Sequence, residues 1–256
     1  MHEISLVLPS FNSDKYLCDV IESFLAQDYP KKKLFIIDGK STDQSHNIIR
    51  SYISKYSNIV WITQRDDGIS DAINISLDYL DDGGIWGYLG ADDILLPRVF
   101  SRVNEIFKAI RFVDALYFDS YSYHPQKNKI HLRSCPEFTK YNLLSLGTVV
   151  GLQNFFIRSE IIKKFRFDNT LKYAMDFDLY LRLLKADCFS FLHVPQASTL
   201  NIQDGNISNI WSVIAETESL VSARKVYGLS FVIFTRYIRH ILRKTFQNVR
   251  MKIGIT

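Results

Sequence analysis

The sequence predicts an α/β fold in which a mixed, mainly parallel sheet is flanked by helices and followed by a C-terminal helical tail. Two observations predict it. Short apolar runs of strand length alternate with segments of helical periodicity as far as about residue 115, and this alternation is typical of parallel sheets. Acidic residues directly follow two of these runs, and open α/β sheets bind ligands at the carboxyl ends of their strands.

Each expected element has a local signal in the sequence. Apolar runs predict strands over residues 4–8, 34–37, 59–63 and 84–89. Helical spacing of apolar residues, supported in one case by the capping residues 41–43, predicts helices over residues 15–27, 44–55, 70–80 and 98–110. Beyond residue 115 we expect antiparallel strands over 115–123 and 129–132, and then helices over 160–165 and 176–186.

The composition is that of a globular protein in a reducing compartment. The chain has 256 residues, 47% hydrophobic and 23% charged, which is enough for one domain with a substantial core. The chain has three cysteines, Cys18, Cys135 and Cys188. Their odd number and wide spacing argue against disulfides and a zinc site. We expect no signal peptide and no membrane-spanning helix. The net charge of +4 is mild and identifies no partner by itself, and no nucleic-acid partner is expected.

Three aspartates follow predicted strands. Asp92 and Asp93 are adjacent carboxylates that repel each other, and a hard divalent cation would relieve that repulsion. The alternative is a solvated turn that caps the following helix. Asp38 ends the second strand and could accept hydrogen bonds from a nucleobase or ribose, or it could be a simple turn residue.

Further acidic residues open two predicted helices. Asp66, Asp71 and Asn74 form a polar cluster at the start of one helix, where acidic residues are favoured in any case. Asp176 and Asp178 open another, and two residues two apart do not share a helix face. One of them could be a general base, whereas Asp178 could form an ordinary surface pair with Arg182.

Taken together, six segments resemble the family 2 glycosyltransferases over residues 4 to about 210. The segments, in chain order, are ISLVLPSFN (4–12), FIIDGKSTDQS (35–45), RDDGISDAIN (65–74), GYLGADDILLP (87–97), AMDFDLYLRLL (174–184) and QDGNIS (203–208). The resemblance implies the Rossmann-like A-type nucleotide-sugar fold. It also implies inversion at the anomeric centre, which gives β-products.

The resemblance implies roles for named residues. The nucleotide-sugar donor, with uracil as its expected base, would be bound by Pro9, Ser10, Asn12, Asp38, Asp66, Asp71 and Asp92. Asp38 would contact the base, Asp92 the ribose or diphosphate, and Asp93 would ligate Mn²⁺ or Mg²⁺. Asp176 would be the catalytic base. Two positions depart from the family pattern: Ala91 replaces the first acid of the metal motif, and Gln203 replaces a histidine in the closing loop.

The resemblance is strongest to enzymes of bacterial O-antigen and exopolysaccharide assembly. It implies transfer of a hexose or N-acetylhexosamine to an undecaprenyl-diphosphate-linked saccharide, with a β-1,3 linkage as the leading expectation. The protein would then be cytoplasmic and peripheral on the inner face of the plasma membrane. The glycosyltransferase domain is expected over residues 1–215, with a donor half to about 115 and an acceptor half over 116–215.

Residues 216–256 are expected to form a basic amphipathic tail. On a helical wheel one face collects apolar residues, namely Phe231, Phe234, Ile238, Ile241 and Leu242. The opposite face collects Arg236, Arg239, His240, Arg243 and Lys244. This pattern suits a helix that lies on an anionic membrane. The alternative is a C-terminal helix that packs on the core and exposes a solvated basic face.

Three other functions are alternatives. A nicotinamide dehydrogenase and a nucleotidyltransferase would each want a glycine-rich loop after the first strand, where this chain has Pro9 to Ser13. A catalytically inactive sugar-nucleotide-binding or scaffold protein stays open, because Ala91 and Gln203 depart from the metal-binding pattern.

Overall fold

The fold is described from a computed structural model that covers residues 1–203, 210–228, 231–239 and 241. The strands are β1 (Ile4–Ser10), β2 (Lys32–Asp38), β3 (Ile59–Thr63), β4 (Ile85–Tyr88), β5 (Asp93–Leu95), β6 (Ala115–His124), β7 (Lys129–Arg133), β8 (Phe155–Arg158) and β9 (Phe191–Ile202). The helices are α1 (Asp14–Leu25), α2 (Ser45–Ile53), α3 (Ile69–Leu77), α4 (Val99–Ala109), α5 (Lys140–Leu146), α6 (Ser159–Phe165), α7 (Met175–Ala186) and α8 (Ile210–Tyr227), with 3-10 turns η1 (Pro125–Lys127) and η2 (Leu152–Asn154).

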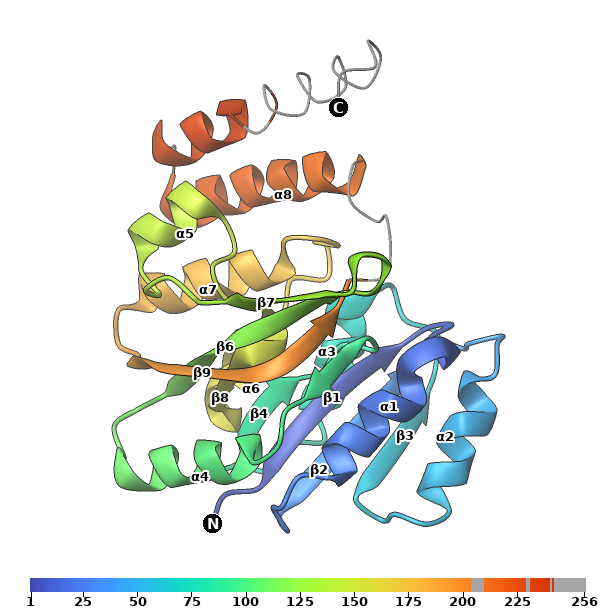
Figure 1. The fold of residues 1–256 in the computed structure, drawn as a ribbon. Helices are drawn as coiled ribbons and strands as arrows, with labels where there is room; N and C mark the ends of the chain where they lie inside the picture. Colours follow the sequence, from blue (N-terminus) through green and yellow to red (C-terminus); the bar gives the residue numbers. More distant parts are fainter. Residues whose placement is uncertain (204–209, 229–230, 240, 242–256) are drawn as a thin grey trace.

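The strands form one mixed sheet in the order β3-β2-β1-β4-β8-β6-β9-β5, and β7 pairs with β6 (Figure 1). Strands β1 to β4 run parallel to their neighbours in the first half of the chain. Strand β8 is antiparallel to both β4 and β6, while β6 and β9 run parallel. The predicted mixed sheet with a parallel first half and flanking helices is therefore confirmed.

Helices cover both faces of the sheet, which explains why its strands appear in the sequence as continuous apolar runs. In β1 and β2, Leu6, Leu8 and Ile36 pack into one core with α1, α2 and α4. The intervening side chains, such as Val7 and Phe35, pack into the other core with α3, α6 and α7. The period of two along each strand thus divides the apolar residues between two layers.

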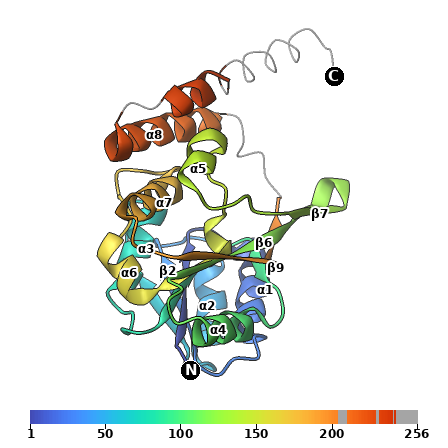
Figure 2. The same ribbon diagram turned by 90° about the vertical axis from the view of Figure 1, so that its left-hand side faces the viewer.

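Helix α7 packs on the sheet, α5 and α8 lie further out on the same side, and the helical segment 231–239 turns back beside α8 (Figures 1 and 2). α8 begins at Ile210, so the predicted boundary between residues 215 and 216 falls inside a helix that packs on α7. Among the described residues, every helix is too short or too polar to cross a bilayer.

The predicted elements of the first 133 residues match the structure closely apart from the missing β5, and the prediction of the second half was less complete. α5, β5, β8 and β9 were not predicted. β5 is three residues long and β8 four, so neither offers enough alternation for a period to be recognised. β9 contains Pro195 and mixes polar with apolar side chains, which lowers its strand signal.

Candidate active site

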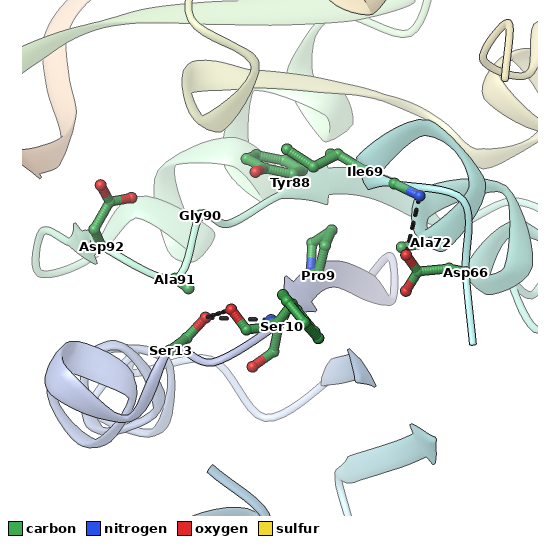
Figure 3. Close-up of a pocket in the computed structure, with 12 residues that line it drawn as sticks. Pro9, Ser10, Ser13, Asp66, Ile69, Ala72, Tyr88, Gly90, Ala91 and Asp92 are labelled. Atoms are coloured by element: carbon green, nitrogen blue, oxygen red, sulfur yellow. Dashed lines mark hydrogen bonds between the residues drawn. The ribbon is translucent and has the colours of Figure 1, made fainter. Parts of the chain in front are cut away.

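A pocket of about 420 Å³ opens at the carboxyl ends of β1 and β4 (Figure 3). Pro9, Ser10 and Ser13 form one wall and Tyr88 lies opposite, while Asp92 and Asp66 lie at its two ends (Figure 3). Gly68, in the left-handed region at φ 116°, leads into α3 at the same pocket. We call this cavity the donor pocket.

Ser10 gives the donor pocket a buried hydroxyl without a protein partner. The residue is 3% exposed, and its Oγ has no hydrogen bond among the described residues. Its backbone carbonyl accepts from the Gly39 N–H at 3.0 Å, which joins the ends of β1 and β2. Ser10 thus gives the pocket wall an unpaired buried polar group, a rare feature in folded proteins that Trp61, Trp86 and Tyr180 share elsewhere in the fold.

Phe11 is an exposed aromatic residue on the rim of the donor pocket. Its side chain is 64% exposed, although a phenyl ring is ordinarily buried. A Cβ on Gly39 would lie 3.4 Å from this ring and 2.9 Å from Asp66 Oδ2, so the three residues meet at one point. Phe11 was not among the predicted donor-binding residues. Its position in a turn between Ser10 and Asn12 is the signal that could have found it.

Asp92 and Asp93 are adjacent, but their carboxylates have different surroundings. Asp92 is exposed, lines the donor pocket, and has a pKa raised by partial burial. Asp93 is 3% exposed, and burial raises its pKa to about 7. Asp93 Oδ1 accepts from Asn201 Nδ2 at 2.6 Å, and Oδ2 accepts from the Gly90 N–H at 3.1 Å. Both oxygens of Asp93 are therefore engaged, whereas Asp92 faces the cavity.

The residues present fit a divalent cation that is shared with a ligand. Among the described residues, no three His, Cys, Asp or Glu side chains gather into a metal cage. Mg²⁺ commonly takes one or two carboxylates together with substrate phosphates and water. Asp92 can supply such a carboxylate from the pocket lining, and Asp93 as the metal ligand stays a prediction.

Asp38 is fully buried at the end of β2 and does not line the donor pocket. Its Oδ2 contacts His46 Nε2 at 2.6 Å and accepts from Thr63 Oγ1 at 3.1 Å. The backbone N–H of Ser41 also donates to this carboxylate. Asp38 therefore holds the loop after β2 in place, which argues against the predicted direct contact with a base.

Two further predicted donor residues also lie outside the pocket lining. Asn12 has φ 51°, and its Oδ1 accepts from the Thr42 N–H at 2.8 Å. Asp71 accepts from the Asp67 N–H at 3.2 Å and from Asn169 Nδ2 at 2.9 Å. Both residues shape the walls of the pocket through neighbouring loops. Pro9, Ser10, Asp66 and Asp92 do line it, as predicted, and burial raises the pKa of Asp66.

Asp176 is the second residue of α7 and is half-buried. Its Oδ1 accepts from the Phe177 N–H at 2.6 Å and from Thr148 Oγ1 at 3.3 Å. Burial raises its pKa to about 6, which suits a general base near neutral pH. Asp178 is 1% exposed and is bonded to Arg182 and Ser222, so it forms a buried pair and not the predicted surface one.

Tyr88 connects the donor pocket to Asp176. Its pKa is raised far above its ordinary value by burial and by the charges of Asp93, Asp92 and Asp176, in that order. The Tyr88 hydroxyl therefore stays protonated and lies within the field of all three carboxylates. This arrangement brings the donor side and the acceptor side of the predicted site together at the end of β4.

In the described part of the tail, the predicted apolar residues are exposed, but Arg236 is buried and not solvated as predicted. Phe231, Phe234 and Ile238 are 81%, 52% and 41% exposed, so the predicted apolar face is open to its surroundings. Arg236, expected on the solvated basic face, is instead 7% exposed and is bonded to Glu216 and to the Leu143 carbonyl. Leu242, Arg243 and Lys244, like His240, lie outside the described residues.

Solved structures share this fold. The UDP complex of S. aureus TarS (residues 1–349) matches with a TM-score of 0.67 and 18% identity, over 94% of this chain and 72% of that one. Glucosyl-3-phosphoglycerate synthase of Mycobacterium tuberculosis, with Mn²⁺, UDP and phosphoglyceric acid, matches at 0.62 and 17% identity, over 90% and 80%. Identities this low establish the fold, which is the A-type fold of the glycosyltransferases.

The sequence comparisons give the family. The chain belongs to glycosyl transferase family 2, whose sequence model matches residues 5–166. A glycosyltransferase of Rickettsia typhi is 25% identical over 198 residues, which are 74% of this chain. The match spans 61% of that relative's length. The chain thus spans less than two thirds of the length of that relative, whereas a glycosyltransferase of Haemophilus influenzae, 26% identical, is matched over 93% of this chain and 97% of its own length.

Proposed function

We propose that the chain transfers a hexose or N-acetylhexosamine from a nucleotide sugar, with inversion, to a saccharide linked to undecaprenyl diphosphate. The observation that carries the donor assignment is the unpartnered, buried hydroxyl of Ser10 in a pocket with a carboxylate at each end. UDP as the nucleotide is supported by the UDP and UDP-GlcNAc complexes of TarS.

The donor pocket offers a distinct contact to each part of a nucleotide sugar. The Phe11 ring would stack on the base, and base stacking on an aromatic side chain stabilises binding by about 1–3 kcal/mol. The Ser10 hydroxyl would donate to the ribose or diphosphate. Asp92 would hold Mn²⁺ or Mg²⁺, and Mn²⁺ accompanies UDP in the mycobacterial enzyme. The bound cation supplies charge neutralisation for the leaving diphosphate.

Asp176 acts as the general base on the acceptor. Its carboxylate takes the proton of an acceptor hydroxyl, whose oxygen forms a bond to the anomeric carbon while the bond to the diphosphate breaks. Thr148 and the Phe177 N–H hold Oδ1, which leaves Oδ2 for the proton. Attack opposite the diphosphate inverts the anomeric centre, so an α-linked donor yields a β-linked product.

The lipid-linked acceptor is supported by the helical segment 231–239. This segment exposes the apolar residues Phe231, Phe234 and Ile238. The sequence has no acidic residue beyond Glu218. Apolar side chains with nearby basic ones suit a helix at an anionic membrane surface. We therefore propose a peripheral protein on the inner face of a bacterial plasma membrane, acting in O-antigen or exopolysaccharide assembly.

A donor panel tests this proposal directly. UDP-linked glucose, galactose, N-acetylglucosamine and N-acetylgalactosamine are each incubated with Mn²⁺ and a synthetic lipid-diphosphate-linked N-acetylhexosamine, and products are read by mass spectrometry. We expect one donor to give a product one sugar heavier. Failure of every nucleotide sugar to be transferred or hydrolysed would reject the enzyme assignment in favour of a binding or scaffold role.

Membrane binding is tested separately by liposome flotation. Full-length protein and a variant without residues 229–256 are mixed with vesicles that contain anionic lipid. We expect the full chain to float with the vesicles and the shortened one to remain below, and equal flotation of both would refute a membrane role for the tail.

A further inference from the structure

A second cavity, of about 410 Å³, lies in the acceptor half and is distinct from the donor pocket. It is enclosed by the middle of β6, the end of β7 and the residues that follow it, the loop after α5, and η2. The β6–β7 hairpin that borders it projects from the sheet in Figure 2. Thr148 lines the cavity and donates to Asp176 Oδ1 at 3.3 Å. The cavity therefore adjoins the residue that we assign as the general base.

Asn154 places unpaired donors in the cavity wall. The residue is 2% exposed, and its Oδ1 accepts from Ser198 Oγ at 2.9 Å and from Thr199 Oγ1 at 2.7 Å. With the amide in this orientation, none of the hydrogen bonds among the described residues uses Asn154 Nδ2. Asn154 Nδ2 is therefore a donor in the cavity lining that a bound ligand can use.

The charge of the cavity wall comes from Arg133. Among the residues that the structure describes, no Asp or Glu lines the cavity and Arg133 forms no ion pair. Asp119 lies behind the wall, where its Oδ1 accepts from the Cys135 N–H at 2.8 Å and contacts His193 Nε2 at 2.9 Å. Burial and the charge of Asp119 raise the pKa of the Cys135 thiol to about 11, so the thiol stays neutral.

The described residues of the cavity wall therefore offer hydrogen-bond donors and a positive charge, but no carboxylate. Arg133 presents a guanidinium, Gln153 presents an amide and Asn154 presents the free Nδ2 hydrogens. A neutral sugar could use such donors, but only an anionic group would also use the uncompensated positive charge. Guanidinium groups bind carboxylate and phosphate in paired hydrogen bonds, which makes them selective for these two groups.

We infer that this cavity binds the acceptor saccharide through an anionic substituent, a carboxylate or a phosphate, with Arg133 as its charge partner and Asn154 as its buried donor. The inference rests on the proposed transferase function, since it names the acceptor class for the same site. Gln153 orients the sugar ring beside this anchor. Thr148 then places the acceptor next to Asp176.

Binding to three small probes tests the inference. The full chain is first saturated with UDP and Mg²⁺ so that the donor pocket is filled. Glucuronic acid, glucose 1-phosphate and methyl glucoside are then titrated while the side-chain amide NMR signals of Gln153 and Asn154 are followed. We expect one of the two anionic probes to shift these signals and to bind about 10- to 100-fold more tightly than methyl glucoside, as a charged hydrogen bond allows.

The anionic probe that binds more tightly identifies the substituent as carboxylate or phosphate. Equal affinity for all three probes, or shifts confined to other residues, would overturn the inference. The affinity for UDP is measured on the same samples. Loss of UDP binding counts against the proposed function, whereas lost probe selectivity with intact UDP binding counts against this cavity alone.

Variants make the test specific to the two donors. Arg133→Gln should remove the preference for the anionic probe, while Lys129→Gln, on the same strand but outside the cavity lining, should retain it. Asn154→Asp keeps the acceptor for Ser198 and Thr199 but replaces the free donor with a carboxylate oxygen, so it should weaken the anionic probe more than tenfold. If both cavity variants bind UDP and keep the anionic preference, the inference is refuted.

Discussion

Arg236 joins the C-terminal helical segment to the acceptor half. Its Nε and Nη2 lie 3.1 and 3.0 Å from Glu216 Oε2, and its Nη1 donates to the Leu143 carbonyl at 2.9 Å. The guanidinium also lies 4.9 Å from the centre of the Phe177 ring. One side chain thus connects α8, the end of α5, and the residue that follows Asp176.

Replacement of Arg236 by Met should destabilise the protein substantially. The change keeps apolar volume but leaves the Glu216 carboxylate without its charged partner, while the Leu143 carbonyl keeps only the hydrogen bond from the Gly147 N–H. Removal of one member of a buried pair costs about 3–5 kcal/mol. Because the Glu216 side chain is 21% exposed, we expect the lower value, about 3 kcal/mol. For a chain of this length that lowers Tm by roughly 6–12 °C.

Urea unfolding at pH 7.5 measures the change in the free energy of unfolding. Arg239→Met is the matched control, since Arg239 is exposed and should lose less than about 0.5 kcal/mol. The double variant Arg236→Met with Glu216→Gln should recover part of the loss, because no unpaired charge remains. If Arg236→Met unfolds at the same urea concentration as the unaltered protein, the buried ion pair has no such role.

The remaining predictions concern the site. Asp176→Asn should lower transfer about 100- to 10,000-fold and leave UDP affinity unchanged, whereas Asp187→Asn at the other end of α7 should be fully active. Transfer should rise with pH through about 6 as Asp176 loses its proton, and a rate that is flat between pH 5 and 7.5 would contradict a base at this position. Phe11→Ala should weaken UDP binding about 5- to 100-fold by calorimetry, and a change below twofold would exclude stacking. The burial-raised pKa of Asp93, about 7 when folded, means that the folded state holds its proton more tightly than the unfolded state. Its contribution to stability should therefore fall as pH rises from about 4 through 7, and the unfolding free energy of Asp93→Asn relative to the unaltered protein should rise over that range.

Local sequence patterns were sufficient for the first half of the fold and for the order of the motifs. Apolar runs such as Leu34–Ile37 lie in fully buried parallel strands, where the pattern is strongest. β8 and β5 are too short to show a period, and their positions depend on pairing with distant strands. Such pairings are tertiary, and no window of neighbouring residues contains them.

The candidate site was likewise predicted only in part. Position at a strand end singled out Asp92, and the family resemblance added Ser10 and Asp66. The three residues line one pocket, because parallel strands end at one edge of the sheet. The division of roles between Asp92 and Asp93 depends on Asn201, which is more than a hundred residues away in β9. The burial of Asp38 likewise depends on His46 and Thr63. Spacing can therefore identify carboxylates at a site, but their partners decide which of them face the ligand.

The burial of Arg236 shows the same limit for the tail. A helical wheel assigns Arg236 to a basic face, but the wheel contains no information on Glu216 or on the open end of α5. The unpaired carbonyls at a helix C-terminus attract a guanidinium. The apolar residues Phe231, Phe234 and Ile238 have no such partner among the described residues and remain exposed, as their pattern indicates.

Calorimetric titration of UDP in the presence of Mn²⁺ tests the donor pocket, on which the whole account depends. The unaltered protein should bind UDP with Mn²⁺ and lose at least tenfold in affinity with a chelator. Asp92→Asn should bind UDP with the weaker affinity whether or not Mn²⁺ is present, while Asp93→Asn should keep its dependence on Mn²⁺. UDP binding that is unaffected by both the chelator and Asp92→Asn, or no UDP binding at all, would contradict the assignment of this pocket.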